Sequence, residues 1–215
     1  MLKRIFDVLL SSIALLIFLP FAIPIVLVLR FTGEGEIFYL QKRIGYRGEP
    51  FFLFKFATML KDSPKLGTGD ITVQNDPRVL PAGKFLRKTK LNEVPQILNI
   101  IKGDMSIVGP RPLTTKNFNF YSDEEKKIIS SMRPGLTGIG SIVFRDEESI
   151  ISTSDKPVDQ CYREEIAPRK ARLEQWYYNH RNFFTDLLII FVTAWVVINS
   201  NSKIYYKIWK DLPII

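Results

Sequence analysis

The sequence predicts a mainly α-helical, membrane-associated protein with only a few short strands. The first reason is an apolar segment from Ile5 to Leu29, which is long enough for a helix to cross a bilayer core of about 30 Å. The second is the region from Lys84 to Ile101, where apolar residues recur at spacings that suit one buried face of a helix, with Pro95 as an interruption. The third is a shorter apolar stretch from Leu187 to Ile198, which suits a helix in the membrane interface or in the core.

The N-terminal apolar segment is expected to be retained as a membrane anchor. It is longer than the apolar region of a usual signal peptide and runs into Arg30 without a small-residue cleavage sequence. Pro20 and Pro24 lie in its middle and are expected to kink the helix. Because basic residues flank both ends, the positive-inside rule favours sending neither end outward. The residues alone fit two topologies, a kinked helix that spans the bilayer and a re-entrant helix that enters and leaves by the same face.

After the anchor, residues 31–168 are expected to form a charged body with mixed local structure. Phe51–Phe56 is strand-like, and Gly45–Gly48 predicts a turn before it. Lys61–Pro81 is rich in Gly, Asp, Pro and Thr, which is typical of a long flexible loop. Gly103 and Asp104 are expected to end the helix that precedes them.

The amino-acid composition limits the kinds of partner and of catalytic chemistry that the protein can use. The 30 Lys and Arg residues against 22 Asp and Glu residues give a formal charge of +8, which favours anionic partners. One cysteine, Cys161, excludes an internal disulfide framework, and the single His180 argues against zinc or histidine-based catalysis. The basic residues do not line one helix with interleaved aromatics, so no nucleic-acid partner is expected. Any chemistry should depend on carboxylates, lysines, arginines and a divalent metal.

Two neighbouring motifs contain the densest group of residues suited to such chemistry. Arg87, Lys88 and Lys90 lie within one or two helical turns of Glu93, and Arg111 stands in a rigid Pro-Arg-Pro sequence. Phosphoryl transfer depends mostly on positioning and on neutralising the charge of phosphate oxygens, for which Arg, Lys and Mg²⁺ are suited. The pattern therefore favours a phosphate-binding site.

These motifs make the chain recognisable, because it resembles the bacterial sugar transferase family. The members in question are the small monotopic polyprenyl-phosphate phosphoglycosyl transferases that begin glycoconjugate assembly. The resemblance runs nearly end to end, and the matching pieces occur in the family's order: Lys3-Arg4, Asp7, Pro20, Gln41, Arg43, Gly45, Lys55-Phe56, Thr58-Met59, residues 84–96, residues 102–112, Arg133-Pro134-Gly135, Thr137-Gly138 and Asp186-Leu187.

The resemblance implies an activity and a topology. The activity would be transfer of a sugar 1-phosphate from a UDP-sugar to undecaprenyl phosphate, initiating capsule, exopolysaccharide, O-antigen or glycoprotein synthesis. Residues 1–30 would be a re-entrant anchor, broken near Pro20, and residues 31–215 a catalytic domain with C-terminal helices in the membrane interface. Both ends of the anchor would face the cytoplasm at the bacterial inner membrane. A homodimer would be compatible with this arrangement.

Residue roles also follow from the resemblance. Glu93 matches the family's glutamate that holds Mg²⁺ at the diphosphate. Lys55, Arg87, Arg111 and Arg133 match basic positions at or near the active site, suited to the diphosphate, the lipid phosphate or the nucleotide. The glycines around Arg111 and Arg133 are expected to shape backbone turns rather than to touch substrate.

The sequence departs from the family pattern at Asn92, where most members have an aspartate that forms a covalent sugar-phosphate intermediate. A neutral amide lacks the anionic oxygen of a carboxylate nucleophile. Three interpretations stay open. In the first, the lipid phosphate attacks the diphosphate directly, with Glu93 and Mg²⁺ orienting both substrates. In the second, a nucleophile comes from the acidic run Asp146, Glu147 and Glu148, with Asp146 or Glu147 favoured. In the third, the protein is a membrane scaffold with no activity or an altered one.

Overall fold

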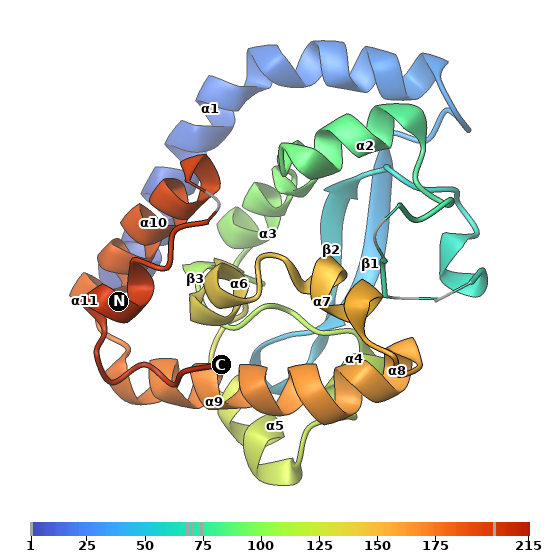
Figure 1. The fold of residues 1–215 in the computed structure, drawn as a ribbon. Helices are drawn as coiled ribbons and strands as arrows, with labels where there is room; N and C mark the ends of the chain where they lie inside the picture. The colour runs from blue at the N-terminus through green and yellow to red at the C-terminus, as the bar shows by residue number, and fades with distance from the viewer. Residues whose placement is uncertain (1, 68, 70, 74, 200) are drawn as a thin grey trace.

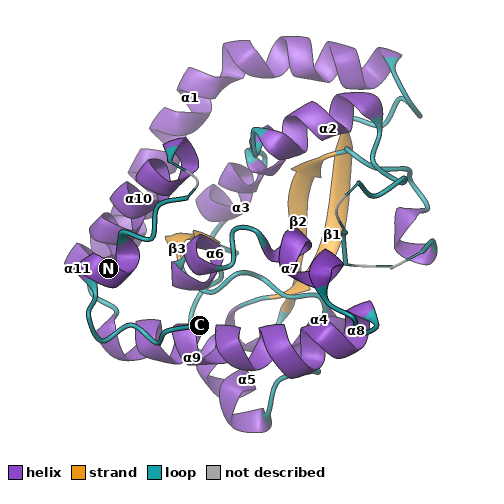
Figure 2. Ribbon diagram, in the orientation of Figure 1, coloured by secondary structure: helices purple, strands orange, loops and turns teal. Residues whose placement is uncertain are grey.

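Most of the chain is helical, and in the described residues the strands form two separate two-stranded sheets (Figure 2). The computed structural model describes residues 2–67, 69, 71–73, 75–199 and 201–215. The predicted class, mainly α-helical with few short strands, is confirmed.

The N-terminal apolar segment forms one helix, α1 (Leu2–Phe31), which contains Pro20 and Pro24. Among the described helices, α1 is the one that is long and apolar enough to cross a membrane. Figure 1 shows that α1 bends, so that its first part lies beside α10 (Phe183–Ile198) and its second part lies over α2 (Pro81–Lys88). Prolines inside a helix produce such bends. The large apolar side chains of α1 are mostly exposed, as expected for a helix in contact with lipid.

The start of α1 is attached to the body by polar contacts. Asp7 is buried and accepts hydrogen bonds from Oγ of Ser106 at 2.7 Å and from the backbone N–H of Ile107 at 3.2 Å. Lys3 forms an ion pair with the buried Asp186 of α10. A buried polar group costs free energy unless it is paired. These contacts satisfy Asp7 and Asp186 and hold the first turns of α1 against β3 (Ser106–Val108) and α10.

The expected strand and turn are present as a β-hairpin. Strands β1 (Phe38–Ile44) and β2 (Pro50–Phe56) are antiparallel, with Tyr39 opposite Lys55. They are joined by Gly45 and the 3₁₀ turn η1 (Tyr46–Gly48). Because side chains alternate along a strand, Gln41, Arg43 and Lys55 point to the same face of this hairpin.

The helix expected over residues 84–101 is divided into three pieces. Helix α2 ends at Lys88, and Lys90 adopts a left-handed conformation with φ of 60°. The 3₁₀ turn η3 (Leu91–Glu93) follows, and Pro95 begins α3 (Gln96–Lys102). Pro95 interrupts the helix as predicted, and Gly103 ends it with φ of 105°. The additional break at Lys90 was not predicted, and it places Glu93 on a tight turn rather than inside a helix.

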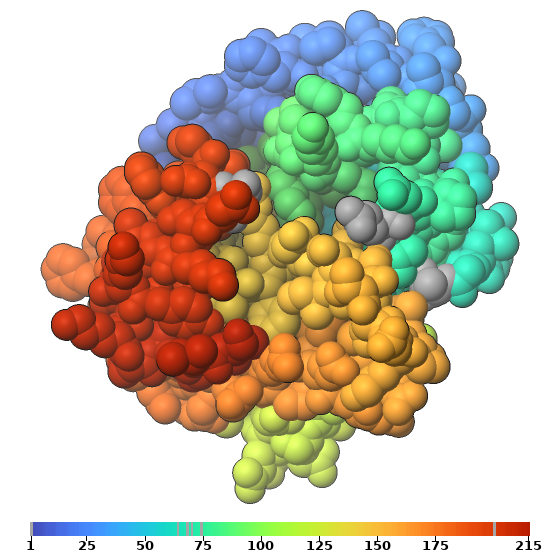
Figure 3. Space-filling model, in the orientation of Figure 1, coloured from blue at the N-terminus to red at the C-terminus, as the bar shows by residue number. Residues whose placement is uncertain are grey.

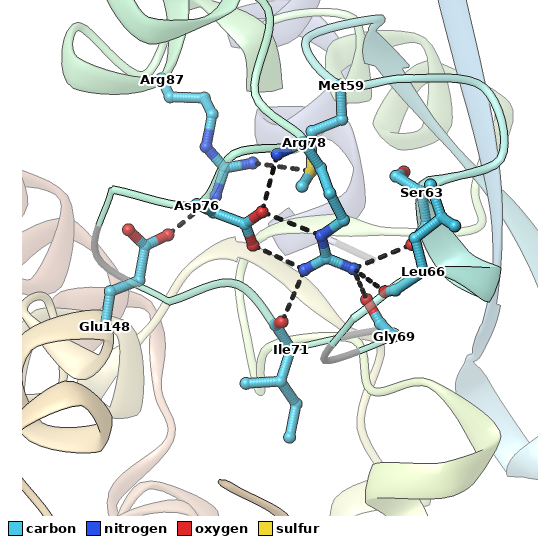
Figure 4. A network of polar contacts seen from close by, with 9 residues as sticks. All are labelled: Met59, Ser63, Leu66, Gly69, Ile71, Asp76, Arg78, Arg87 and Glu148. Atoms are coloured by element: carbon cyan, nitrogen blue, oxygen red, sulfur yellow. Dashed lines mark hydrogen bonds and ion pairs between the residues drawn. The ribbon is translucent and has the colours of Figure 1, made fainter.

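The loop before α2 is held together by a single buried arginine, Arg78. Its guanidinium forms a bidentate ion pair with the buried Asp76, at 2.9 Å and 2.6 Å. The 3₁₀ turn η2 (Ser63–Lys65) belongs to this loop. Figure 4 shows Arg78 at the centre of the described part of the loop, donating to the backbone carbonyl oxygens of Ser63, Leu66, Gly69 and Ile71.

The second sheet pairs β3 (Ser106–Val108) in parallel with β4 (Gly135–Thr137). Two short helices separate these strands, α4 (Thr115–Phe118) and α5 (Asp123–Ser130). All three residues of β3 are buried, and its last two contribute to the main hydrophobic core.

The C-terminal third supplies most of that core. Helix α9 (Ala167–His180) packs against α5 and α6 (Ile139–Val143). Figure 1 shows α10 beside α1. Helix α10 buries one face, through Ile189, Val192 and Val196, and exposes the other, so it serves both the core and the surface. The elements in order are α6 (Ile139–Val143), α7 (Glu147–Thr153), α8 (Val158–Cys161), the π-helical turn η4 (Tyr162–Ile166), α9 (Ala167–His180), α10 and α11 (Tyr205–Ile208).

Candidate functional site

Glu93 lies among basic side chains that come from three different segments. Nη2 of Arg111 donates to Oε1 of Glu93 at 2.8 Å, and 15% of the Glu93 side chain is exposed against 40% of the Arg111 side chain. Burial alone would raise the pKa of Glu93, but the charges of Arg111 and Lys55, the hydrogen bond from Arg111 and the charge of Lys90 outweigh it. Together they hold the pKa of Glu93 well below its usual range, so that it stays a carboxylate.

Lys55 reaches this group from β2. Its Nζ donates to Oε1 of Gln41 at 3.4 Å, and Nη2 of Arg43 donates to the same oxygen at 2.6 Å. Nη1 of Arg43 donates to the carbonyl oxygen of Pro112 at 3.0 Å, which connects the hairpin to the Pro-Arg-Pro sequence. Burial, followed by the positive charge of Arg43, lowers the pKa of Lys55 to about 7, while Glu93 acts in the opposite direction. Lys55 can therefore gain or lose its proton near neutral pH.

The backbone around Arg111 is fixed by a close approach of two chain segments. A Cβ atom on Gly109 would lie 2.2 Å from the carbonyl oxygen of Arg133, and one on Gly135 would lie 2.1 Å from the backbone nitrogen of Gly109. No side chain fits at either position. The backbone-shaping role expected of these glycines agrees with this packing, which holds the start of the Pro-Arg-Pro sequence against β4.

Arg87, at the end of α2, lies at the border between the basic group and the acidic run. Its Nη2 donates to Oε1 of Glu148 at 2.8 Å, and its Nη1 contacts Sδ of Met59 at 3.8 Å (Figure 4). The charge of Arg87 also contributes to the lowered pKa of Lys55, after larger contributions from burial, Arg43 and others. Arg87 is thus within electrostatic reach of Lys55.

Arg133 stands apart from this group in the described contacts. It is exposed, its Nε donates to the carbonyl oxygen of Gly103 at 3.1 Å, and its guanidinium lies 5.2 Å from the ring centroid of Tyr46. The structure therefore brings Lys55 and Arg111 to Glu93, places Arg87 beside Glu148, and gives Arg133 contacts with Gly103 and Tyr46 instead.

The acidic run is the start of α7, and its three carboxylates differ. Asp146 is exposed, and its side chain makes no capping hydrogen bond to the helix. Glu147 forms an ion pair with the buried Lys170 of α9, and Glu148 pairs with Arg87. Two of the three acidic residues are therefore engaged with cations of the site and its surroundings.

Asn92 is buried beside Glu93 on η3, and its Oδ1 has no hydrogen-bond partner among the described residues. Such an amide oxygen costs about 1–3 kcal/mol unless something binds it. Within the described residues, no group of three or more His, Cys, Asp or Glu side chains could hold a metal by itself. Magnesium is commonly held by one or two carboxylates together with substrate phosphates. Glu93 and Oδ1 of Asn92 therefore fit a magnesium ion that arrives with a diphosphate, rather than one held by the protein alone.

Sequence reasoning did not identify Lys170 or the contacts of Gln41. Gln41 and Arg43 alternate along β1, so the pairing of the hairpin would have shown that they face Lys55. Lys170 lies in a charge-rich helix, where nothing distinguishes a buried lysine from a solvated one.

Comparison with known proteins identifies the family to which the chain belongs. The family model described as "Bacterial sugar transferase" matches residues 1–200. The chain is 36% identical over 217 residues to the "Exopolysaccharide production protein ExoY" of Rhizobium meliloti, covering 94% of this chain and 88% of that protein. It is 31% identical to the "Undecaprenyl-phosphate galactose phosphotransferase" of Salmonella typhimurium, covering 94% of this chain and 41% of that protein. It is 35% identical to the "UDP-glucose:undecaprenyl-phosphate glucose-1-phosphate transferase" of Escherichia coli, covering 74% of this chain and 35% of that protein. The chain thus spans most of the first protein and less than half of the other two.

Proposed function

Since this chain belongs to the bacterial sugar transferase family, we propose that it transfers a sugar 1-phosphate from a UDP-sugar to undecaprenyl phosphate and so initiates the synthesis of a surface polysaccharide or another glycoconjugate. The names of the relatives from Salmonella typhimurium and Escherichia coli support both the lipid acceptor and the sugar-phosphate donor. The observation that carries the proposal is the ionised Glu93 between Arg111 and Lys55, because this arrangement is suited to a metal-bound diphosphate.

The basic residues have separate tasks in this proposal. Arg111, with its guanidinium fixed by the Pro-Arg-Pro backbone, binds oxygens of the diphosphate in a defined orientation. Lys55 and Arg87 neutralise the charge that shifts to the leaving UMP. Glu93 and Oδ1 of Asn92 would hold Mg²⁺, which supplies Lewis-acid polarisation of the phosphoryl oxygens when bound. Arg133, on the neighbouring surface, is proposed to contact a more distant part of the substrates.

Two routes to the phosphorus atom fit this arrangement. In the first, an oxygen of the lipid phosphate attacks the sugar-linked phosphorus directly, and the bond to the UMP oxygen breaks. In the second, a carboxylate attacks that phosphorus and releases UMP, and the lipid phosphate then cleaves the acyl phosphate and regenerates the carboxylate. The contact of Glu147 with Lys170 near Arg111 favours Glu147 over the exposed Asp146 in this second route.

We also propose that residues 1–30 are a re-entrant anchor and residues 31–215 the catalytic domain, on the cytoplasmic face of the inner membrane. The support is that both ends of α1 pack on the same body. Asp7 is hydrogen-bonded to Ser106, and Leu29 is buried in a cluster with Phe56 and Leu86. A spanning helix would carry one of its ends away from the body. Packing of both ends on one body leaves the middle of α1, near Pro20, as the part that enters the lipid.

The topology can be tested by thiol labelling. Cys161 is buried, so single cysteines introduced as Leu2→Cys and Glu34→Cys report on the two ends of α1. In sealed inverted membrane vesicles, an impermeant maleimide should label both positions. Labelling of only one of the two would contradict the re-entrant anchor.

The activity can be tested by release of UMP from UDP-glucose, UDP-galactose and UDP-N-acetylgalactosamine. We expect release with at least one donor that requires both undecaprenyl phosphate and Mg²⁺. Glu93→Gln should abolish it, whereas Glu36→Gln, which breaks an exposed pair with Lys61, should not. Absence of UMP release by the wild-type protein with all three donors would contradict the proposed activity and favour a scaffold.

A further inference from the structure

Lys170 of α9 is a buried cation that the proposed transfer does not use directly. Only 6% of the residue is exposed, and its ammonium lies 5.5 Å from the ring centroid of Phe144 and 5.5 Å from that of Tyr162. A lysine loses much of its hydration in such a place, so a carboxylate must compensate. The carboxylate is Glu147, whose Oε2 accepts a hydrogen bond from Lys170 Nζ.

Helix α7 is held from two directions by consecutive carboxylates. Glu147 is bound to Lys170 of α9. Glu148 is bound to Arg87 of α2, as Figure 4 shows. The side chains of the first pair are 8% and 24% exposed, whereas those of the second pair are 24% and 50% exposed. Exposed ion pairs contribute little to stability, so the pair with Lys170 should determine where α7 lies.

This pairing keeps Glu147 within electrostatic reach of Arg111. The pKa of Arg111 is raised mainly by Glu93, and the charge of Glu147 adds to that effect. The face drawn in Figure 3 is hollowed between α2 and the C-terminal segment, and the region of α6 and α7 lies beside this hollow. A movement of α7 would therefore change the charge that acts on Arg111.

We propose that Lys170 is a positioning residue for the sugar-phosphate transfer: it holds Glu147, and with it the start of α7, beside Arg111, at a site where Asn92 supplies no anionic oxygen. Lys170 itself contacts neither substrate. The inference rests on the proposed function for the reaction that is being supported. The placement of α7 by Lys170, however, can be measured without turnover.

The placement is tested by hydrogen–deuterium exchange of the α7 amides in detergent-solubilised protein. Lys170→Met keeps the length and removes the charge, and we expect exchange over residues 147–153 to rise by about tenfold or more because the segment opens more often. Lys156→Met is the matched control, because Lys156 forms exposed pairs with Glu164 and Glu165. It should leave the exchange of α7 unchanged. Wild-type exchange in Lys170→Met would overturn the proposal.

The functional consequence is tested by a double-mutant cycle on kcat for UMP release. We expect Lys170→Met to lower kcat about tenfold and Lys170→Arg to recover most of the loss. If the lipid phosphate attacks directly, Glu147→Gln keeps measurable turnover, and Lys170→Met should add nothing in that background. A further tenfold loss in that background would show that Lys170 acts elsewhere and would overturn the proposal. If Glu147 is the nucleophile and Glu147→Gln releases no UMP, the exchange experiment and the recovery by Lys170→Arg decide.

Two outcomes outside the cycle are also decisive. If Lys170→Met does not fold, the double variant Lys170→Met/Glu147→Gln, which removes both charges, is compared with Glu147→Gln alone. If the wild type releases no UMP from any donor, the proposed function fails, and the exchange experiment still decides the role of Lys170.

Discussion

Raising the pH through 7 should remove the positive charge with which Lys55 is proposed to bind the donor. Burial, and then the charge of Arg43, lowers the pKa of Lys55 from 10.5 to about 7 in the substrate-free protein. Neutral Lys55 attracts phosphate oxygens much less than its ammonium form. The bound diphosphate should in turn raise the pKa of Lys55, so the effect should be larger in kcat/KM than in kcat.

The size of the effect follows from that pKa. If only the ammonium form binds the donor, kcat/KM should fall to about one tenth of its maximum at pH 8 and to about one hundredth at pH 9. The stability of the folded protein should instead rise as the pH rises. Between pH 7 and 10.5 the unfolded chain holds a proton that folded Lys55 has lost, so the free energy of unfolding should rise by at most about 1.4 kcal/mol per pH unit.

The assay is initial-rate UMP release from about pH 6 to about pH 9 at a donor concentration well below KM. Lys55→Arg is the matched variant, because a guanidinium stays protonated across this range. Its profile should lose the decline centred near pH 7. A wild-type profile without that decline, or the same decline in Lys55→Arg, would refute the assignment to Lys55.

Three further changes test separate parts of the structure. If the lipid phosphate attacks directly, Asn92→Ala should keep substantial UMP release at saturating Mg²⁺ but should need more Mg²⁺ to reach it, because one proposed ligand is lost; near-total loss at saturating Mg²⁺ would instead point to an essential amide. Arg78→Met should lower the free energy of unfolding by about 3–5 kcal/mol, because it leaves Asp76 buried without its cation; a thermal midpoint equal to that of the wild type would contradict this. Gly109→Ala should abolish activity and lower the thermal midpoint, since its Cβ would lie 2.2 Å from the carbonyl oxygen of Arg133; a wild-type rate would show that this backbone contact can open.

Apolar runs and glycine positions in the sequence predicted the helices and turns that depend on the residues within them. The apolar run produced α1, and Gly48 in the predicted turn and Gly103 at the helix end adopt the left-handed backbone that glycine permits. The break at Lys90 could not be predicted in this way. Lysine has no preference for its observed φ of 60°, so tertiary packing must impose this conformation.

The candidate site was predicted as a set of residues but not as an arrangement. Glu93 and Arg111 could be named from their motifs, yet their contact depends on the packing of β3 against β4. Arg133 was grouped with them by resemblance, whereas its guanidinium lies over Tyr46. Lys170 escaped notice because the face that a charge-rich helix buries is decided by its neighbours, not by its own sequence.

The two hydrogen bonds that Asp7 accepts have a mechanical consequence. They join the lipid-facing helix directly to Ser106 and Ile107, and Arg111 follows only a few residues further along the chain. If α1 enters the bilayer as proposed, its depth and tilt would be transmitted to the guanidinium that is proposed to bind the diphosphate. The rate of the proposed transfer would then depend on bilayer thickness. A generic transmembrane segment in place of α1 would restore attachment to the membrane without restoring this linkage.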